Sequence, residues 1–324
     1  MVPAAVERLA AIPRVELGHY PTPIDELTRL RAALGGGPRL LVKRDDAIDF
    51  GFGGNKVRKL RIVAARALAE SADTLLTAGG LQSNHCRATA AAAAKLGLRC
   101  GLVVNGEPPA RPSANALLVE LLGAEIQYVA TRADRQPALA AAADALRARG
   151  AHPYVIPVGA STPLGALAFA DAIGEMYAQG VVPDTIVHAT SSGGTQAGLI
   201  AGCAFLGLST RVLGISADEP APALAAEVRR ILNGMEALLG LDEGTLAGPA
   251  IEIDDGFVGE GYGIPTPDSR EAGELLARSE ALLVDQTYTA KAAAGLIAYV
   301  RSGRLRGDQT ILFWHTGGQV GVFA

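Results

Sequence analysis

Short apolar runs alternate along the chain with longer segments in which apolar residues recur every three or four positions. The segment 55–70 shows the second pattern, with Leu60, Val63 and Ala67 on one helical face. Helices are also predicted at 83–95, 114–122, 135–149 and 195–205. Strands are predicted at 40–43, 74–77, 101–104, 125–129, 153–156, 185–189, 211–216, 282–284 and 310–314. This alternation predicts an α/β fold in which helices cover both faces of parallel sheets.

Proline clusters divide this pattern into two parts. The clusters at 108–112 and 157–163 flank a middle unit, and a length of 324 residues suits two domains. We predict a large domain built from residues 1–57 and 166–324, with a smaller α/β domain of residues 58–165 inserted in it. Ligands of open α/β sheets bind beyond the carboxyl ends of the strands. The loops after the strands are therefore the places to search for a site.

Composition and charge narrow the class of partner. Hydrophobic residues make up 49% of the chain and charged residues 19%, which indicates a large buried core and excludes disorder. The net charge is −4 and the sequence has no basic stripe, so neither nucleic acid nor a membrane surface is an expected partner. The apolar runs are also shorter than the ~20 residues of a spanning helix. A small-molecule partner is expected.

Cysteine and histidine usage indicates a reducing compartment and a site without a metal. The N-terminal residues 1–14 lack the basic start and apolar block of a signal peptide. Cys86, Cys100 and Cys203 form no CxxC pair and cannot all be bridged, so a cytoplasmic location is the simpler prediction. The five histidines show no ligand spacing, and no zinc site is expected.

A lysine follows two glycines where the helix 55–70 begins. Gly53 and Gly54 permit unusual backbone angles and the close approach of a ligand. Lys56 lies beside Arg58, Lys59 and the positive end of the helix, and all of these disfavour its charged form. A neutral amine is what Schiff-base chemistry needs. The plain alternative is a group of surface cations near a tight turn, and this segment alone favours that alternative.

The segment 190–199, with the sequence TSSGGTQAGL, connects a predicted strand to a predicted helix. Hydroxyl groups and free backbone N–H groups at a helix N-terminus form an anion cradle that suits a phosphate monoester. The segment lacks the Walker lysine and does not match the GxGxxG fingerprint of dinucleotide sites. Because glycine-rich turns also make plain connections, this segment alone favours a phosphate site and a simple turn equally.

Polar side chains also fill the turn between the strand 74–77 and the helix 83–95. Ser83 or Asn84 is an N-cap in the plain interpretation. In the functional interpretation the turn surrounds a ligand carboxylate or phenolate with Gln82, Ser83, Asn84 and His85. Tyrosines in the segments 261–265 and 288–291, and the turn 315–318, are by themselves consistent with ordinary packing.

In combination these segments are far more specific than any one of them. The chain resembles the family of 1-aminocyclopropane-1-carboxylate (ACC) deaminases and D-cysteine desulfhydrases, which are pyridoxal-phosphate enzymes of the tryptophan-synthase-β-like group, or fold type II. The resemblance follows family order through 21–23, 43–46, 53–56, 82–85, 157–165, 191–199, 261–265, 288–291 and 315–318. It implies two open, twisted, mostly parallel sheets flanked by helices, pyridoxal 5'-phosphate as the cofactor, a small amino-acid substrate and a homodimer.

The resemblance also implies roles for the matching residues. Lys56 matches the lysine that binds the cofactor and moves the substrate α-proton. Asn84 matches the side chain that contacts the phenolic oxygen of the cofactor, and Ser83 matches a serine near the substrate carboxylate. The predicted catalytic residues are Lys56, Ser83, Tyr262 and Tyr288, and the predicted substrate contacts are Gln82, Ser83, Asn84 and His85. The phosphate loop is predicted from Ser191, Ser192, Gly193, Gly194 and Thr195, with help from Asn55 and Lys59.

Two threonines indicate the branch of the family. In the deaminases a glutamate that meets the pyridine nitrogen typically follows the second tyrosine, whereas this chain has Thr289. The desulfhydrase-like branch resembles this chain more closely, and we predict that Thr289 and Thr316 face the nitrogen. The predicted reaction is α,β-elimination, with D-cysteine giving pyruvate, ammonia and hydrogen sulfide. The alternatives are L-cysteate sulfo-lyase, ACC deaminase, another elimination, replacement or racemisation on this cofactor, and a catalytically silent binding protein.

Overall fold

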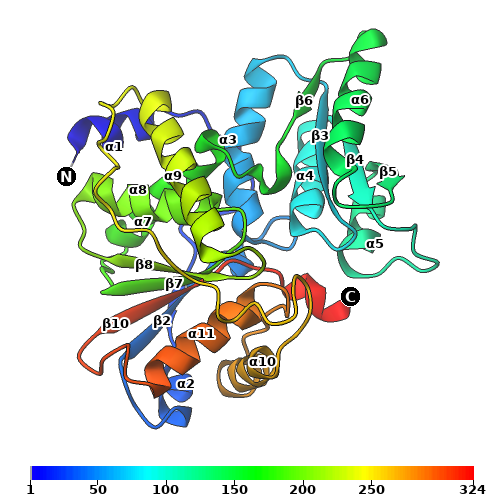
Figure 1. The fold of residues 1–324 in the computed structure, drawn as a ribbon. Coiled ribbons are helices and arrows are strands. Elements are labelled where there is room, and N and C mark those ends of the chain that lie inside the picture. The colour runs from blue at the N-terminus through cyan, green and yellow to red at the C-terminus, as the bar shows by residue number, and fades with distance from the viewer. Residues whose placement is uncertain (1) are drawn as a thin grey trace.

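Two sheets organise the chain in the computed structural model, which describes residues 2–324 (Figure 1). The larger sheet has six strands in the order β1 (Ile24–Glu26), β2 (Arg39–Arg44), β10 (Thr310–His315), β7 (Thr185–Thr190), β8 (Arg211–Ser216) and β9 (Glu252–Asp254). The smaller sheet has four, in the order β5 (Glu125–Val129), β4 (Arg99–Asn105), β3 (Thr74–Gly80) and β6 (Pro153–Val155). Neighbouring strands are parallel, except that β1 is antiparallel to β2. The predicted α/β class with mostly parallel sheets is confirmed.

Helices cover both faces of each sheet (Figure 1). One face of the large sheet packs against α7 (Pro163–Ala178), α8 (Gly194–Leu206) and α9 (Ala221–Leu238), with α1 (Pro3–Ala10) outside them. Its other face packs against α2 (Thr28–Ala33), α10 (Pro267–Glu280) and α11 (Thr289–Arg301). The small sheet lies between α6 (Arg135–Ala148) on one side and, on the other, α3 (Asn55–Ala69), α4 (Asn84–Leu96) and α5 (Ala114–Leu121).

Small residues allow α7 and α8 to approach closely. A β-carbon at Gly198 would lie 2.1 Å from the carbonyl oxygen of Ala166, and one at Gly202 would lie 2.7 Å from the β-carbon of Ile173. Any side chain at these two glycines would therefore push the helices apart. This close packing fixes the first turn of α8 directly after β7, at the carboxyl edge of the large sheet.

The segment 282–284 is not a strand, so the prediction made for it is wrong. Leu282 and Val284 are buried and Leu283 is exposed, which reproduces the alternation of a strand. The backbone joins neither sheet within residues 2–324. Instead, the Leu283 carbonyl accepts a hydrogen bond from Nε2 of His315 at 3.0 Å. Alternation predicts which side chains are buried, but a strand also needs a neighbour that satisfies its backbone groups.

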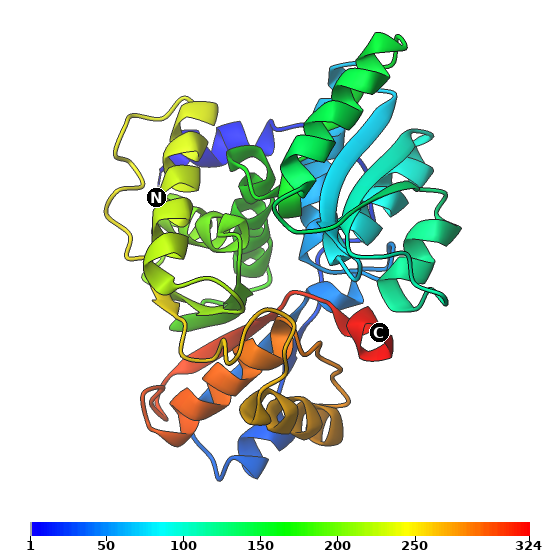
Figure 2. The same ribbon diagram turned by 45° about the vertical axis from the view of Figure 1, so that its right-hand side comes forward.

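The smaller sheet is built from one continuous stretch of the chain. All four of its strands lie between Thr74 and Val155, inside the segment 58–165 that is predicted as an insertion. The domain boundaries themselves stay a prediction. After β10 the chain returns to this part of the molecule, because η3 (Gln319–Phe323) packs against α5 (Figure 2). None of the helices in residues 2–324 has the length and hydropathy needed to cross a membrane.

Candidate active site

A cavity lies where the carboxyl ends of strands from both sheets face each other. Its wall includes Gly79 and Gly80 at the end of β3, Thr190 at the end of β7, and Gly317 just after β10. The predicted site residues that line it are Asn55, Lys56, Ser83, Asn84, His85, Ser191, Ser192, Gly193, Thr195, Tyr262, Tyr288 and Thr316. Four other predicted residues lie outside the lining, namely Lys59, Gln82, Gly194 and Thr289.

Lys56 enters the cavity from the first turn of α3. The tight approach to this turn requires glycine, because Gly53 has φ 66° and a β-carbon there would lie 2.4 Å from the carbonyl oxygen of Asp46. Nζ of Lys56 lies 3.4 Å from the carbonyl oxygen of Gly159. Burial lowers the pKa of the Lys56 amine to about 8. The cause is desolvation and not, as predicted from the sequence, the neighbouring cations.

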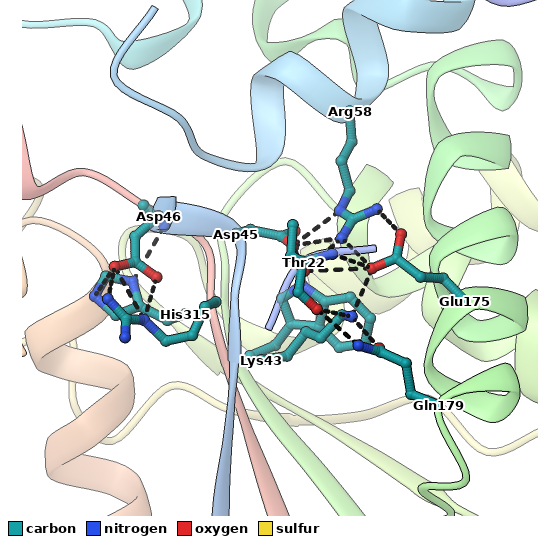
Figure 3. Close-up of polar contacts among 11 residues, drawn as sticks. Thr22, Lys43, Asp45, Asp46, Arg58, Glu175, Gln179 and His315 are labelled. Carbon is teal, nitrogen blue, oxygen red and sulfur yellow. Dashed lines mark hydrogen bonds and ion pairs between the residues drawn. The ribbon is translucent and has the colours of Figure 1, made fainter. Parts of the chain in front are cut away.

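A buried charge network supports the turn before Lys56 (Figure 3). Arg58 donates to Oδ1 of Asp45 at 2.8 Å and to Oε2 of Glu175 at 2.8 Å. Lys43 donates to Oε1 of the same Glu175 at 2.5 Å, and Trp314 Nε1 donates to Oδ2 of Asp45 at 2.8 Å. Asp45 belongs to η1 (Asp45–Ala47), and its backbone carbonyl accepts from Gly54 N–H at 2.7 Å. The charge of Arg58 is thus used for structure and is directed away from the cavity.

The first turn of α8 forms an anion cradle with groups from α3 and η2 (Val158–Ala160). Nζ of Lys59 is buried and donates to the carbonyl oxygen of Gly159 at 3.2 Å and to Oγ of Ser161 at 3.1 Å. Ser161 Oγ in turn lies 2.6 Å from Oγ of Ser192. Within residues 2–324 no carboxylate pairs with Lys59. Burial, and after it the nearby Lys56, lower the pKa of Lys59 well below its ordinary value, and an anion bound beside this helix N-terminus would stabilise the charged form of its amine.

Two further contacts shape the cradle. Asn55 Nδ2 donates to Oγ1 of Thr195 at 3.2 Å, which joins the start of α3 to the start of α8. Gly194 lies so close to Lys59 that a β-carbon would stand 2.9 Å from its Nζ. The hydroxyl of Thr190 is buried and has no hydrogen-bond partner among residues 2–324. Asn55 and Thr195 thus bond to each other, whereas the Thr190 hydroxyl is left for a ligand.

Asn84 is oriented by two residues that the sequence analysis missed. Its Oδ1 accepts hydrogen bonds from Arg87 Nη1 at 3.0 Å and from Asn115 Nδ2 at 2.9 Å. Arg87 also donates to the carbonyl oxygen of Gly53 at 2.8 Å, which ties Asn84 to the turn of Lys56. With its oxygen engaged, Asn84 presents its NH₂ group to the cavity. Gln82 does not line the cavity. It holds Asn115 in place, because its Oε1 accepts a hydrogen bond from the backbone N–H of Asn115 at 2.9 Å.

Ser83 and His85 complete the turn before α4. Ser83 is both a cavity residue and the N-cap of α4, because its Oγ accepts from the Cys86 N–H at 3.2 Å. His85 Nε2 lies 3.0 Å from Oγ1 of Thr77. Burial holds the pKa of His85 well below its ordinary value, helped by the charges of Lys56 and Lys59. His85 is therefore a neutral imidazole at pH 7.

Two tyrosines meet in the wall of the cavity. The hydroxyl groups of Tyr262 and Tyr288 are hydrogen-bonded, and their rings are 5.7 Å apart at an angle of 72°. Lys291 holds the Tyr262 loop, because its Nζ donates to the carbonyl oxygens of Val258 at 2.7 Å and Gly261 at 2.9 Å. Burial raises the pKa of both phenols. Both are thus neutral at pH 7 and able to donate a proton.

Asp285 brings a carboxyl group to the cavity wall. It lies before the N-terminus of α11 and accepts from the backbone N–H groups of Tyr288 at 2.8 Å and Thr289 at 3.1 Å. The Thr289 hydroxyl also donates to Oδ1 of Asp285 at 2.7 Å. Thr289 therefore contacts a cavity residue without lining the cavity itself, whereas Thr316 lines it. Burial raises the pKa of Asp285. Asp285 is not among the residues predicted from the sequence, because α11 is not predicted either; an acidic residue before a helix is the signal that identifies it.

Two cations in the cavity wall were also not predicted. Arg132 and Arg135 lie in and after the turn between β5 and α6, far along the chain from every motif of the sequence analysis. No group of three or more metal-ligating side chains occurs in the part of the chain that the structure describes, residues 2–324. The cavity therefore combines one desolvated amine, an anion cradle, two phenols and two arginines.

Comparisons with known proteins agree with this geometry. A family model described as "Pyridoxal-phosphate dependent enzyme" matches residues 15–317. A crystal structure described as an ACC deaminase homologue is 34% identical, with 100% of this chain and 97% of that chain covered and a TM-score of 0.91. A threonine deaminase from T.th. (22% identity, coverage 98% and 96%, TM-score 0.67) and threonine deaminase isoform 2 from Solanum lycopersicum (16%, 97% and 83%, 0.70) share the fold.

Proposed function

The chain belongs to the family of pyridoxal-phosphate dependent enzymes, and from that premise we propose that it catalyses α,β-elimination on a small β-substituted amino acid. D-Cysteine is the first candidate substrate, with pyruvate, ammonia and hydrogen sulfide as products. The observation that carries the proposal is the desolvated amine of Lys56, with a pKa of about 8, in one cavity with two neutral phenols. A base and an acid for the same reaction are thus present together.

The residues of the cavity fit pyridoxal 5'-phosphate. The uncompensated charge of Lys59 and the first turn of α8, with Ser192 and Thr195, suit the phosphate group. The amine of Lys56 suits the aldehyde, and the NH₂ group of Asn84 suits the phenolic oxygen. When bound, the cofactor withdraws electrons from the substrate α-carbon and makes its proton acidic.

Different side chains of the cavity accept the α-proton and donate a proton to the leaving group. Among residues 2–324, Lys56 is the only lysine in the cavity lining, and a base with a pKa of about 8 accepts a proton efficiently near neutral pH. Ser83 lies at the N-terminus of α4, where its hydroxyl and the free N–H groups suit a substrate carboxylate. The hydrogen-bonded pair of Tyr262 and Tyr288 supplies the proton for the leaving group. Positioned proton transfers of this kind contribute ~10²–10⁴-fold to a rate.

A second candidate function is the deamination of ACC. Thr289 in place of a glutamate disfavours this function, because it would leave the site without a carboxylate near the pyridine nitrogen. Asp285 nonetheless brings a carboxyl group to the cavity wall, and the 34% identical structure is described as an ACC deaminase homologue. The two functions differ in product, since ACC gives 2-oxobutanoate and ammonia. A cytoplasmic location, which is in keeping with three free cysteines, and a homodimer are also part of our proposal.

The test is a substrate panel with the purified holoenzyme. D-Cysteine, L-cysteate and ACC are added separately, while the visible absorption band and the 2-oxoacid product are recorded. We expect D-cysteine to shift the band and to yield pyruvate. If the band ignores D-cysteine and ACC yields 2-oxobutanoate, the second candidate replaces the first.

The matched variants are Lys56→Ala and Lys95→Ala, which changes an exposed lysine at the end of α4. We expect Lys56→Ala to lower pyruvate formation by about 10³-fold or more, with an unchanged circular dichroism spectrum. Lys95→Ala should retain wild-type activity. Activity of Lys56→Ala near that of Lys95→Ala would contradict the role of this amine.

A further inference from the structure

Arg132 and Arg135 reach the cavity from the segment that leads into α6. The charge of Arg132 is already compensated, because its Nη1 lies 2.9 Å from Oδ2 of Asp218 and its Nη2 lies 3.5 Å from Oε1 of Glu219. The Arg132 side chain is also largely exposed. Solvent and two carboxylates thus stabilise the charge of Arg132, and no bound ligand is needed to compensate it.

Arg135 differs in both respects. Its guanidinium is half-buried, and its hydrogen bonds go to the amide oxygen of Asn105, with Nε at 2.8 Å. Within residues 2–324 no carboxylate lies within ion-pair distance of it. Burial lowers the pKa of Arg135, and the nearby positive charge of Arg132 lowers it further. A partly buried cation without an anionic partner is costly by itself and favours the binding of an anion from solution.

The place of Arg135 indicates which part of a substrate would carry that anion. A β-carbon at Gly80 would lie 3.5 Å from Nη2 of Arg135, so the glycine leaves the guanidinium open beside the turn of Ser83. Tyr262 and Tyr288 lie close enough to influence the pKa of Arg135. The phosphate cradle is built from other groups, Lys59, Ser161 and Ser192. Arg135 therefore faces the side on which the phenols protonate a leaving group.

We propose that Arg135 is a specificity-determining residue that binds an oxyanionic β-substituent of the substrate, of the sulfonate class. This inference rests on the elimination proposed above and names its substrate class. A guanidinium fork matches two oxygens of such a group. A thiol substituent is mostly neutral at pH 7, since its ordinary pKa is about 8.5, and would make no use of this charge.

The sulfonate also satisfies the chemistry of elimination. The α-C–H bond and the Cβ–S bond break, the α-proton goes to Lys56, and the electron pair of the Cβ–S bond leaves with the sulfur. Cysteate and one water thus give pyruvate, ammonium and hydrogen sulfite, with no oxidant or reductant. Arg135 lowers the cost of the charge on the departing group.

The test compares a substrate whose β-substituent is anionic with one whose β-substituent is uncharged, in three variants of the holoenzyme. Cysteate, as both enantiomers, and β-chloroalanine are the substrates, and pyruvate is measured. We expect Arg135→Gln to lower kcat/KM for cysteate by about 10–100-fold, mainly through KM, and to change it for β-chloroalanine less than about threefold. Arg135→Lys should retain part of the preference because it keeps the charge. The control is Arg147→Gln, on the exposed side of the same helix.

Each outcome decides a different claim. An equal loss on both substrates would show that Arg135 only fastens α6 to β4, and would overturn the inference. Turnover of β-chloroalanine without turnover of cysteate by the wild-type enzyme would overturn it as well, but would leave the elimination standing. Failure of all these substrates and of D-cysteine would overturn the proposed function. Calorimetry with unreactive 3-sulfopropanoate then decides the anion site independently, with about tenfold weaker binding expected for Arg135→Gln.

Discussion

Three cations within one turn of α3 have three different uses. Lys56 points into the cavity, Arg58 is paired with Asp45 and Glu175, and Lys59 reaches the cradle of α8. Successive residues on a helix are separated by about 100° around its axis. Residues 56, 58 and 59 therefore meet different surroundings although they are close in sequence. Burial, rather than the neighbouring charges, sets the pKa of Lys56.

The lowered pKa of Lys56 predicts how cofactor binding depends on pH. Only the neutral amine attacks an aldehyde, and its fraction rises about tenfold per pH unit below the pKa of about 8. We expect the rate of pyridoxal-phosphate incorporation into the apoprotein to rise from pH 6 to 8 and to level off near pH 9. Stopped-flow absorption measures this rate, with Lys56→Ala as the blank. A rate that still rises tenfold between pH 9 and 10 would indicate an unperturbed lysine.

Sequence reasoning places residues in the cavity where they follow a strand or begin a helix. Lys56, Ser83 and Ser192 all lie at such junctions, and parallel strands bring these junctions to one edge. It misses Arg87 and Asn115, which act on Asn84 through side-chain contacts. Such contacts depend on how α4 and α5 pack, and neither residue belongs to a motif. The predicted roles of the site residues stay predictions.

At the scale of elements, the pairing of α7 with α8 is controlled by glycine. Both helices are apolar on nearly all sides because they are buried between the sheet and α9. Their sequences therefore lack the polar stripe that marks a surface helix, and α7 was not predicted. The edge strands β1 (sequence IDE) and β9 (sequence EID) were missed for another reason, since each has one apolar residue among its three and so forms no apolar run.

The glycine contact predicts the effect of a single methyl group. In Gly198→Ala the new β-carbon would meet the Ala166 carbonyl oxygen at 2.1 Å, so α8 must shift. We expect the free energy of unfolding to fall by about 1–3 kcal/mol, as measured by urea denaturation. The phosphate cradle lies on the first turn of the same helix, and weaker pyridoxal-phosphate binding is expected to accompany this loss.

The matched control is Gly174→Ala in α7, where no atom lies within 4 Å of the added β-carbon. Because glycine is a poor helix former, this change should stabilise the protein by about 0.5–1 kcal/mol. Equal effects of the two substitutions would contradict the close-packing argument.

At the scale of the whole molecule, one buried network joins parts of the chain that are far apart in sequence. It includes Lys43 from β2, Arg58 from α3 and Glu175 from α7 (Figure 3). Trp314 from β10 joins it through Asp45. The sequence shows these residues only as isolated charges, because their pairing depends on how α3 and α7 pack over the large sheet. The network thereby couples the stability of the fold to the turn that carries Lys56.

The titration of Glu175 predicts how the stability of the fold depends on pH. Burial alone would raise the pKa of its carboxyl group, but hydrogen bonds and charges from Arg58 and Lys43 outweigh burial and lower the pKa to about 2, from an ordinary 4.5. A lowered pKa means that the carboxylate stabilises the fold fully above pH 4.5 and that this stabilisation, about 3 kcal/mol, is lost as the pH falls toward 2. Urea unfolding at several pH values, followed by the fluorescence of Trp314, the one tryptophan, should record this loss.

Glu175→Gln removes the titrating group and leaves Lys43 and Arg58 short of one negative charge. We expect its free energy of unfolding at pH 7 to fall by about 3–5 kcal/mol, because buried cations lose their partner. Its stability should then depend less on pH between 4.5 and 2 than that of the wild type. The control is Glu274→Gln, an exposed member of an i,i+4 pair, for which a change within about 0.5 kcal/mol is expected. An identical pH dependence in Glu175→Gln and the wild type would mean that acid unfolds this protein through other carboxylates.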